Sequence, residues 1–149
     1  MRTALGIALG LTLATALPAH AVQVRDCDET ASVLSIAEPW EKNTRAFYDG
    51  NVRVAMLDTG GEPVCCSVHL MILVPDKTDE LGGRTCKIVS DKDALGFVGI
   101  DFARIATRYD AGRGLLITFP YELYVDGIRH RSGVARVRVN VDRGAVTVE

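Results

Sequence analysis

The sequence predicts an all-β fold, a single-domain antiparallel β-sandwich or flattened barrel of about six to eight strands with an irregular N-terminal strap. Short segments in which apolar and polar residues alternate follow one another along most of the chain, and turn residues separate them at close spacing. Helical periodicity is almost absent. Four cysteines add the expectation that disulfides brace the fold.

Residues 1–21 have the pattern of a cleaved secretory signal peptide. Arg2 supplies a positive charge, a short apolar run occupies residues 5–17, and residues 19–21 (Ala-His-Ala) form a small-x-small cleavage site. The apolar run is too short to span a bilayer as a permanent helix. We therefore expect a periplasmic or secreted protein with no membrane span, in which residues 22–149 form one domain.

The composition of residues 22–149 argues against one class of partner. Of the 17 lysines and arginines only Arg2 lies in the leader, so 16 basic residues oppose 19 acidic ones. A slightly acidic, exported chain has no electrostatic attraction for nucleic acid, and no nucleic-acid partner is expected. The length suffices for one hydrophobic core but not comfortably for two.

The least regular part of the sequence is residues 22–50, which we interpret as a strap of turns with one short helix. Residues 31–36 are compatible with a short strand or a helical turn. Pro39 stands where a short helix can begin, with acidic residues around its first turn. The Asp49-Gly50 pair is a hairpin signal.

The central strand is predicted over residues 64–74, the most apolar run after the leader. With a period of two, one face of this strand is wholly apolar, whereas the other carries Cys65, Ser67 and His69 and is mixed. Alternation predicts further strands over residues 52–56, 86–89, 98–105, 115–125, 135–141 and 146–148.

The segments between these strands carry more specific expectations. Residues 75–83 are polar and are predicted to form a loop, and residues 129–131 are predicted to form another. The alternation of residues 98–105 changes parity near Ala103, which predicts a bulge there. Pro120 lacks an amide hydrogen, so the strand over residues 115–125 is predicted to lie at or near a sheet edge at that point.

The cysteines Cys27, Cys65, Cys66 and Cys86 are all expected to form disulfides, because an exported chain with an even cysteine count favours bridges over metal thiolates. Neighbouring residues on an extended strand point to opposite faces. We therefore expect Cys65 and Cys66 to reach different partners, one Cys27 and the other Cys86. A bridge between the two neighbours would distort the peptide that joins them.

Catalytic and cofactor motifs are absent from the sequence. It contains no Gly-x-Ser-x-Gly, Ser-x-x-Lys or His-Glu-x-x-His motif and no phosphate-binding loop. His69 with nearby cysteines and Met71 would suit a soft metal ion. However, four strand residues separate Cys65 from His69 by about 13 Å, so a structural histidine is the preferred interpretation and no metal or cofactor is predicted.

Three other interpretations are weaker. The Cys65-Cys66 pair lacks the Cys-x-x-Cys spacing at a helix start that exchange enzymes use, so structural bridges are preferred. The acidic residues of loop 75–83 lack the spacing of a calcium loop. Trp40 invites a carbohydrate-stacking role, but we expect it to cover one end of the sandwich.

The sequence offers one candidate binding surface, which is basic. It consists of Arg129, His130, Arg131, Arg136 and Arg138. On the outer face of a sheet these residues would attract an acidic envelope protein or a polyanionic ligand. The alternative is that arginines only solvate that face and deter edge pairing.

Arginine outnumbers lysine 13 to 4, and alanine and glycine are frequent, a composition typical of a bacterium with a GC-rich genome. The preferred function is therefore that of a non-enzymatic binding or accessory module of the bacterial cell envelope. The rival is a small exported hydrolase, or another enzyme, with a site around His69 or His130 and nearby carboxylates. A structural accessory without a ligand is a third possibility. No family resemblance accompanies these expectations.

Overall fold

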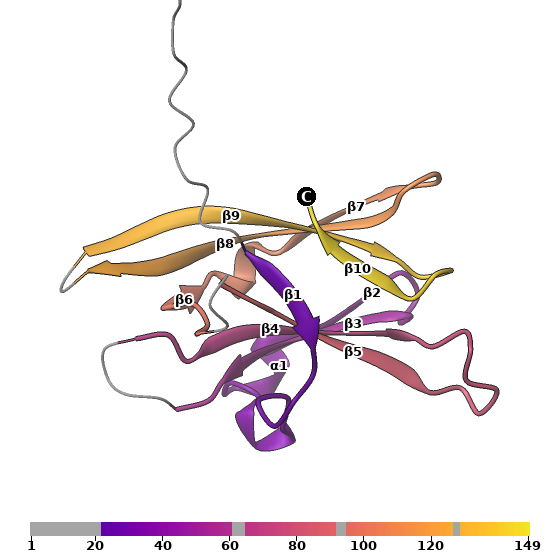
Figure 1. Cartoon of the computed structure of the whole chain (residues 1–149), viewed down its shortest axis with the longest axis horizontal. Coiled ribbons are helices and arrows are strands. Elements are labelled where there is room, and N and C mark those ends of the chain that lie inside the picture. Colours follow the sequence, from indigo (N-terminus) through magenta and orange to yellow (C-terminus); the bar gives the residue numbers. More distant parts are fainter. Residues whose placement is uncertain (1–21, 61–64, 92–94, 127–128) are drawn as a thin grey trace, which may run out of the picture.

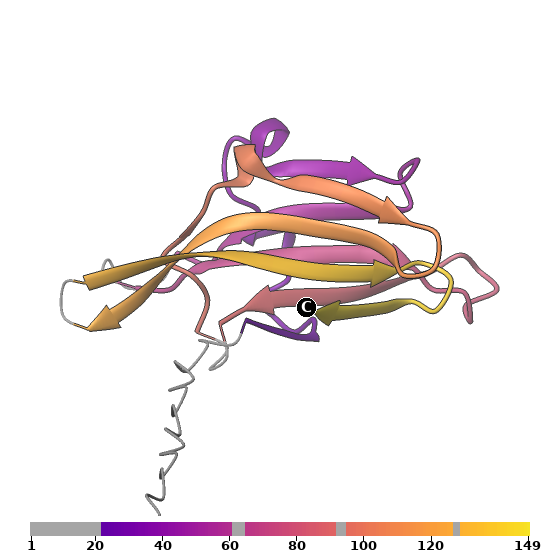
Figure 2. The ribbon, with the colours of Figure 1, turned by 90° about the horizontal axis from the view of Figure 1, so that it is seen from above.

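Two antiparallel β-sheets of five strands each face one another in the computed structural model (Figures 1 and 2). The structure describes residues 22–60, 65–91, 95–126 and 129–149, so the predicted signal peptide lies outside the described residues. The first sheet, sheet A, has the order β1 (Gln23–Asp26), β5 (Arg84–Ser90), β4 (Val68–Pro75), β3 (Val52–Asp58) and β2 (Thr44–Phe47). The second, sheet B, has the order β10 (Ala145–Val148), β9 (Arg129–Asn140), β8 (Gly114–Asp126) and β6 (Gly99–Ile100), with β7 (Ala106–Asp110) also paired to β8.

The predicted all-β, disulfide-braced sandwich is thus confirmed, although the described residues form more strands than expected. The additional strands are short. β1 and β2 lie within the segment interpreted as a strap, β6 is all that forms of the strand predicted over residues 98–105, and β7 was not predicted.

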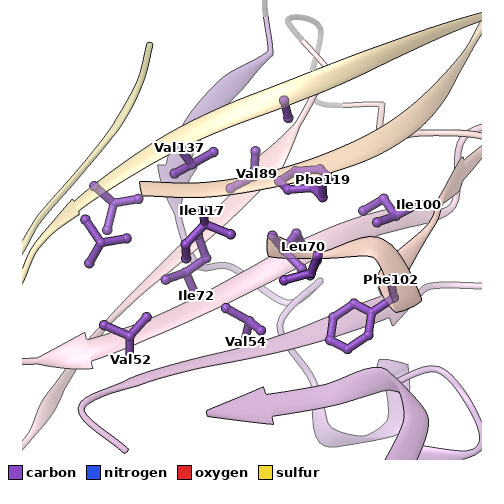
Figure 3. Close-up of a cluster of buried hydrophobic side chains, with 14 of the residues drawn as sticks. Val52, Val54, Leu70, Ile72, Val89, Ile100, Phe102, Ile117, Phe119 and Val137 are labelled. Carbon is purple, nitrogen blue, oxygen red and sulfur yellow. The ribbon is translucent and has the colours of Figure 1, made fainter. Parts of the chain in front are cut away.

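The core lies between the two sheets and comes from the alternation seen in the sequence. β4 contributes Leu70, Ile72 and Val74, and β8 contributes Ile117 and Phe119, all with no exposed surface. Figure 3 shows apolar side chains from both sheets meeting in this core, among them Leu70 and Ile72 of β4 and Ile117 and Phe119 of β8. Burial of branched and aromatic side chains on facing sheet surfaces is what holds a sandwich together.

The strap, now defined as residues 27–43, crosses the outer face of sheet A from β1 at one edge to β2 at the other. It contains two short helices, η1 (Val33–Ser35) and α1 (Trp40–Asn43), and the predicted helix start at Pro39 is confirmed. Ile36 bridges to Leu57, and the amide of Ala37 donates to the carbonyl of Met56 at 2.9 Å. Figure 1 shows α1 on the side of sheet A that faces away from sheet B.

Trp40, at the start of α1, is less buried than predicted, because 45% of its surface is exposed. The Asp49-Gly50 hairpin is confirmed. It joins β2 to β3, and its tight turn has positive φ at Tyr48, Asp49 and Gly50. The loop predicted over residues 75–83 is also present between β4 and β5.

Two sequence predictions on sheet B were wrong in detail. The parity change near Ala103 comes from a short helix, η2 (Phe102–Arg104), and not from a bulge within one strand. Arg129, His130 and Arg131 belong to strand β9, because the β8–β9 pairing continues to Arg129. They do not form a loop.

Pro120 lies in β8, directly beside the edge strands β6 and β7, which agrees with the predicted position at or near a sheet edge. β8 pairs with β9 along one side, and on the other side its partner changes from β7 to β6 around Pro120. The carbonyl of Pro120 accepts a hydrogen bond from the amide of Asp101 at 3.0 Å. The nitrogen of Pro120 points to the same side as this carbonyl, into the gap between two strands, so no ladder bond requires its missing hydrogen.

The disulfide pairing corrects the predicted connectivity. Cys27 is bonded to Cys86, and Cys65 is bonded to its neighbour Cys66. β4 begins at Val68, so the two neighbours precede the strand, and Cys66 has a φ of +75°. Neighbouring side chains point to opposite faces only where the backbone is extended. Cys66 is not extended, so its side chain can reach that of Cys65.

Two disulfides indicate that the protein folds in an oxidising environment of the extracellular type. Among the described residues, no helix has the length and apolarity needed to cross a bilayer.

Candidate functional site

The outer face of sheet B brings together arginines from strands that are distant in sequence. Paired residues of neighbouring strands share a face of the sheet. Arg108 on β7 and Arg138 on β9 both pair with Leu116 on β8, and Ala106 and Arg136 both pair with Thr118. Arg108 and Arg138 therefore face each other across one strand, with Cα atoms about 10 Å apart.

Arg138 is held in place by Glu149. Its Nε lies 2.8 Å from Oε1 of Glu149 and its Nη2 lies 3.1 Å from Oε2, while its Nη1 donates to the carbonyl of Gly114 at 3.1 Å. The Arg138 side chain is only 8% exposed. This pair raises the pKa of Arg138 and lowers the pKa of Glu149, chiefly through the hydrogen bonds between them. Bidentate contacts of this kind fix a guanidinium in one orientation.

Two further arginines contact the same carboxylate. Arg113, in the turn between β7 and β8, pairs with Glu149, and Nη2 of Arg136 lies 3.7 Å from Oε2 of Glu149. Arg136 remains half exposed. One carboxylate therefore contacts three guanidinium groups and cannot neutralise all of them. Arg136, which has a long contact and is half exposed, can still bind another anion.

Arg108 and Arg136 border a hollow of about 260 Å3 whose floor is formed by Leu116 and Thr118. Leu116 lies on the outer face and yet is only 3% exposed, since the aliphatic stems of the surrounding side chains cover it. Arg108 is exposed and pairs with no carboxylate in the described part of the chain. We call the surface formed by Arg108, Arg113, Arg136 and Arg138 the arginine groove.

The arginine groove carries excess positive charge. Among the described residues, the carboxylates that act on Arg138 are Glu149 and Asp110, and Asp110 accepts hydrogen bonds from the amides of Gly112 and Arg113 through one oxygen. Four guanidinium groups thus face two carboxylates. The excess attracts anions, and the neighbouring strands place the arginines on a rigid surface.

The structure divides the basic surface predicted from sequence. Arg136 and Arg138 lie together in the arginine groove, and His130 lies farther along the same face of β9. Arg129 and Arg131 alternate onto the opposite face, where Arg131 pairs with Leu123 of β8. Arg129 is bonded to Asp126, which lowers the pKa of the Asp126 carboxyl.

A second hollow, of about 590 Å3, lies next to the arginine groove along the outer face of β8. Its lining includes Pro120, Glu122, Ser132 and Val134, with Asp101 and Arg104 at one side. Nδ1 of His130 lies 3.7 Å from Oε2 of Glu122. This is the histidine–carboxylate contact that the rival hydrolase hypothesis requires, but both side chains are about half exposed.

His69 has a structural position. It is 4% exposed, with Gly96 directly beside its imidazole ring, and burial is the main cause that lowers its pKa, with a smaller contribution from Arg25. Its Nδ1 has no hydrogen-bond partner in the described part of the protein. The described residues also show no group of three or more histidine, cysteine, aspartate or glutamate side chains placed to hold a metal ion.

Sequence reasoning missed Arg108, Arg113 and Glu149. Arg108 belongs to a strand whose five residues are all exposed, so no apolar alternation marks it. The role of Glu149 depends on β10 returning beside β9, where its amide donates to the carbonyl of Arg136 at 2.9 Å. In comparisons with protein families, curated proteins and solved structures, no match to this chain was found.

Proposed function

We propose that this protein is an exported, non-enzymatic binding module of the bacterial cell envelope that recognises an anionic partner or ligand through the arginine groove. The observation that carries the proposal is the position of Arg108 and Arg136 on either side of a hollow, where Arg108 has no carboxylate partner among the described residues and Arg136 is half exposed. The predicted leader and the two disulfides support export to the periplasm or the exterior.

The arrangement suits anion binding better than catalysis. Guanidinium groups are always charged and present a planar set of donors to carboxylate, phosphate or sulfate groups. Arg138 and Arg113 are already engaged by Glu149, so they shape the groove, while Arg108 and Arg136 are available to the ligand. An acidic protein segment and a polyanionic glycan share the chemistry that this surface recognises.

The test compares two double variants with the same change in net charge. Arg108→Glu with Arg136→Glu reverses the charges that border the hollow. Arg131→Glu with Arg143→Glu is the matched control, because both arginines are exposed and their side chains make no ion pair in the described part of the protein. Binding is measured by fluorescence anisotropy with a labelled polyglutamate peptide and with dextran sulfate, at low and at physiological salt.

We expect the groove variant to lose about tenfold or more in affinity, equal to about 1.4 kcal/mol, and the control to lose little. Preference for the peptide or the sulfated polymer distinguishes an acidic protein from a glycan. Equal losses in both variants would mean that net charge alone attracts the probe. Absence of binding to every probe at low salt would reject the proposal.

A hydrolase is the second candidate, favoured by the contact between His130 and Glu122 beside the larger hollow. Ser132 pairs with Glu122 and shares this face with His130. Hydrolysis of an activated ester that is lost in both His130→Gln and Ser132→Ala would support this function. Activity unaffected by either change would exclude a site at these residues.

A further inference from the structure

The outer face of sheet A holds a second surface, independent of the arginine groove and on the opposite side of the sandwich. Strand register arranges its side chains in rows. One row contains Ala46, Arg53, Leu73 and Cys86. The next contains Thr44, Ala55, Met71 and Ile88, and Leu57 and His69 form a third.

The third row is closed, by the strap over Leu57 and by Gly96 beside His69, whereas much of the other two rows is open. Leu57 is fully buried because Ile36 bridges to it, and His69 is 4% exposed. By contrast, Met71 and Leu73 are only partly buried and Ala46 is exposed. Figure 1 shows the strap and α1 beneath one part of sheet A, while the end of the sheet near the β4–β5 loop has no segment below it.

A hollow of about 390 Å3 lies where the strap ends, a volume within the range of small-molecule sites. The alanines at positions 46 and 55 create it, since their short side chains lie among the longer ones of Ile36, Met71 and Leu73. Ala55 is 3% exposed and forms part of the floor. η1 extends the apolar surface beside Ile36 with Val33 and Leu34, which are 59% and 92% exposed.

One unpaired cation lines this apolar hollow. Arg53 lies between Ala46 and Leu73 in its row, is exposed, and forms no ion pair or side-chain hydrogen bond with another described residue. The nearby arginines are engaged: Arg45 with the carbonyl of Ala103 and the ring of Phe102, and Arg84 with the carbonyls of Asn51 and Gly50. No carboxylate is among the described residues that line the hollow.

We propose that this hollow binds a free single-chain carboxylate amphiphile of the fatty-acid class. The alkyl chain lies over Ala46, Ala55, Met71 and Leu73 and removes their apolar surface from water. The carboxylate binds the guanidinium of Arg53, whose planar donors match its two oxygens. The lining holds two guanidinium groups, of which Arg45 is engaged by the Ala103 carbonyl and the Phe102 ring, and no carboxylate among its described residues. An apolar hollow with one free guanidinium, that of Arg53, and no anion selects a ligand with a single negative head.

The test uses dodecanoate below its micellar concentration, with binding measured by isothermal titration calorimetry on the disulfide-intact protein. Dodecanol and dodecyltrimethylammonium, which share the chain and differ in the head, are compared. Ala46→Leu fills the hollow, and Arg53→Gln removes the cation while keeping a polar side chain of similar length. Ala111→Leu in the β7–β8 turn and Arg131→Gln on β9 are the matched controls, because both residues are exposed and line neither this hollow nor that of the arginine groove.

We expect dodecanoate to bind, with affinity reduced about tenfold or more by Ala46→Leu and by Arg53→Gln and unchanged in the controls. Dodecanol should bind more weakly, and the cationic amphiphile should not bind. Circular dichroism checks the fold, and if Ala46→Leu proves unfolded, Met71→Gln tests the same wall of the hollow.

Four results would overturn the proposal. Equal binding of the cationic amphiphile would show that the head is not recognised, and full affinity in folded Ala46→Leu would place the ligand elsewhere. Binding only to phosphatidylglycerol vesicles would identify a membrane surface as the occupant. Self-association that Ala46→Leu abolishes, without dodecanoate binding, would identify a second copy of the chain. Dodecanoate binding to the Arg108→Glu, Arg136→Glu double variant distinguishes the two sites, because affinity that is unchanged there is not due to the arginine groove.

Discussion

Arg138 and Glu149 form a two-point contact, with Nε of the guanidinium 2.8 Å from one carboxylate oxygen and Nη2 3.1 Å from the other. The contact fixes the final residue of the chain against β9 and orients the wall of the arginine groove. Because Arg113 and Arg136 contact the same carboxylate, a change at Glu149 affects the groove as a unit.

The first prediction concerns stability in acid. The pKa of Glu149 is lowered in the folded protein relative to its ordinary value of 4.5, mainly by Arg138. The unfolded chain therefore takes up the proton first, so the stabilisation is present above about pH 4.5 and is lost as the pH falls through the folded-state pKa. Urea unfolding between about pH 6 and pH 3 should show a steeper loss for the wild type than for Glu149→Gln.

Glu122→Gln is the control for this prediction, because the Glu122 side chain is half exposed and contacts His130 instead of an arginine. Glu122→Gln should show the same steep loss of stability in acid as the wild type. Identical pH profiles for wild type and Glu149→Gln would show that the pair does not contribute to stability.

The second prediction concerns His69, whose folded-state pKa lies below its ordinary value of 6.5, chiefly because the imidazole is buried. The charged groups that influence it are Arg25, Asp28, Asp58 and Asp91. The unfolded chain binds a proton more readily, so stability is present above about pH 6.5 and falls as the pH drops towards the folded-state pKa.

His69→Leu should remove this loss of stability and change the free energy of unfolding at pH 8 by about 1 kcal/mol or less, since Nδ1 has no partner within the described residues. His130→Gln, on the exposed outer face of sheet B, should leave the loss of stability at low pH unchanged. Urea unfolding at several pH values provides the measurement. A His69→Leu profile parallel to the wild type would contradict the assignment.

The third prediction separates the two disulfides. Cys27 and Cys86 are 59 residues apart, so their bridge restricts a long loop of the unfolded chain, and its loss in Cys27→Ser with Cys86→Ser should cost about 4 kcal/mol. Cys65 and Cys66 are adjacent and close no loop. Replacing both with serine should cost less than about 1 kcal/mol. Denaturant unfolding of the two double variants measures the difference, and the opposite ranking would reject the chain-entropy explanation.

The fourth prediction concerns Gly96, which has a φ of +91°. A Cβ atom added there would lie 2.5 Å from the carbonyl oxygen of Cys66 and 2.7 Å from Cε1 of His69. Gly96→Ala should therefore destabilise the protein by about 2 kcal/mol or more, through backbone strain and overpacking. Gly99→Ala, where a Cβ meets nothing within 4 Å, should cost about 1 kcal/mol or less. Thermal unfolding compares the two variants, and equal melting temperatures would contradict the prediction.

The sequence by itself determined the fold class, the inward faces of the long strands and the tight turn at Asp49-Gly50. Alternation along residues 115–125 places Ile117 and Phe119 in the core, as the structure confirms. These features depend on neighbours in sequence, because the period of two and the preference of glycine for positive φ are local properties.

Only the tertiary structure decided the disulfide pairing and the membership of the arginine groove. Cys65 and Cys66 can pair because both precede β4 and Cys66 is not extended. The period-two argument had assumed an extended chain at both residues. Arg108 and Arg136 meet because β7 and β9 both pair with β8. Pairing and register are relations between distant segments, set by burial of the whole core, and a pattern within one segment does not contain them.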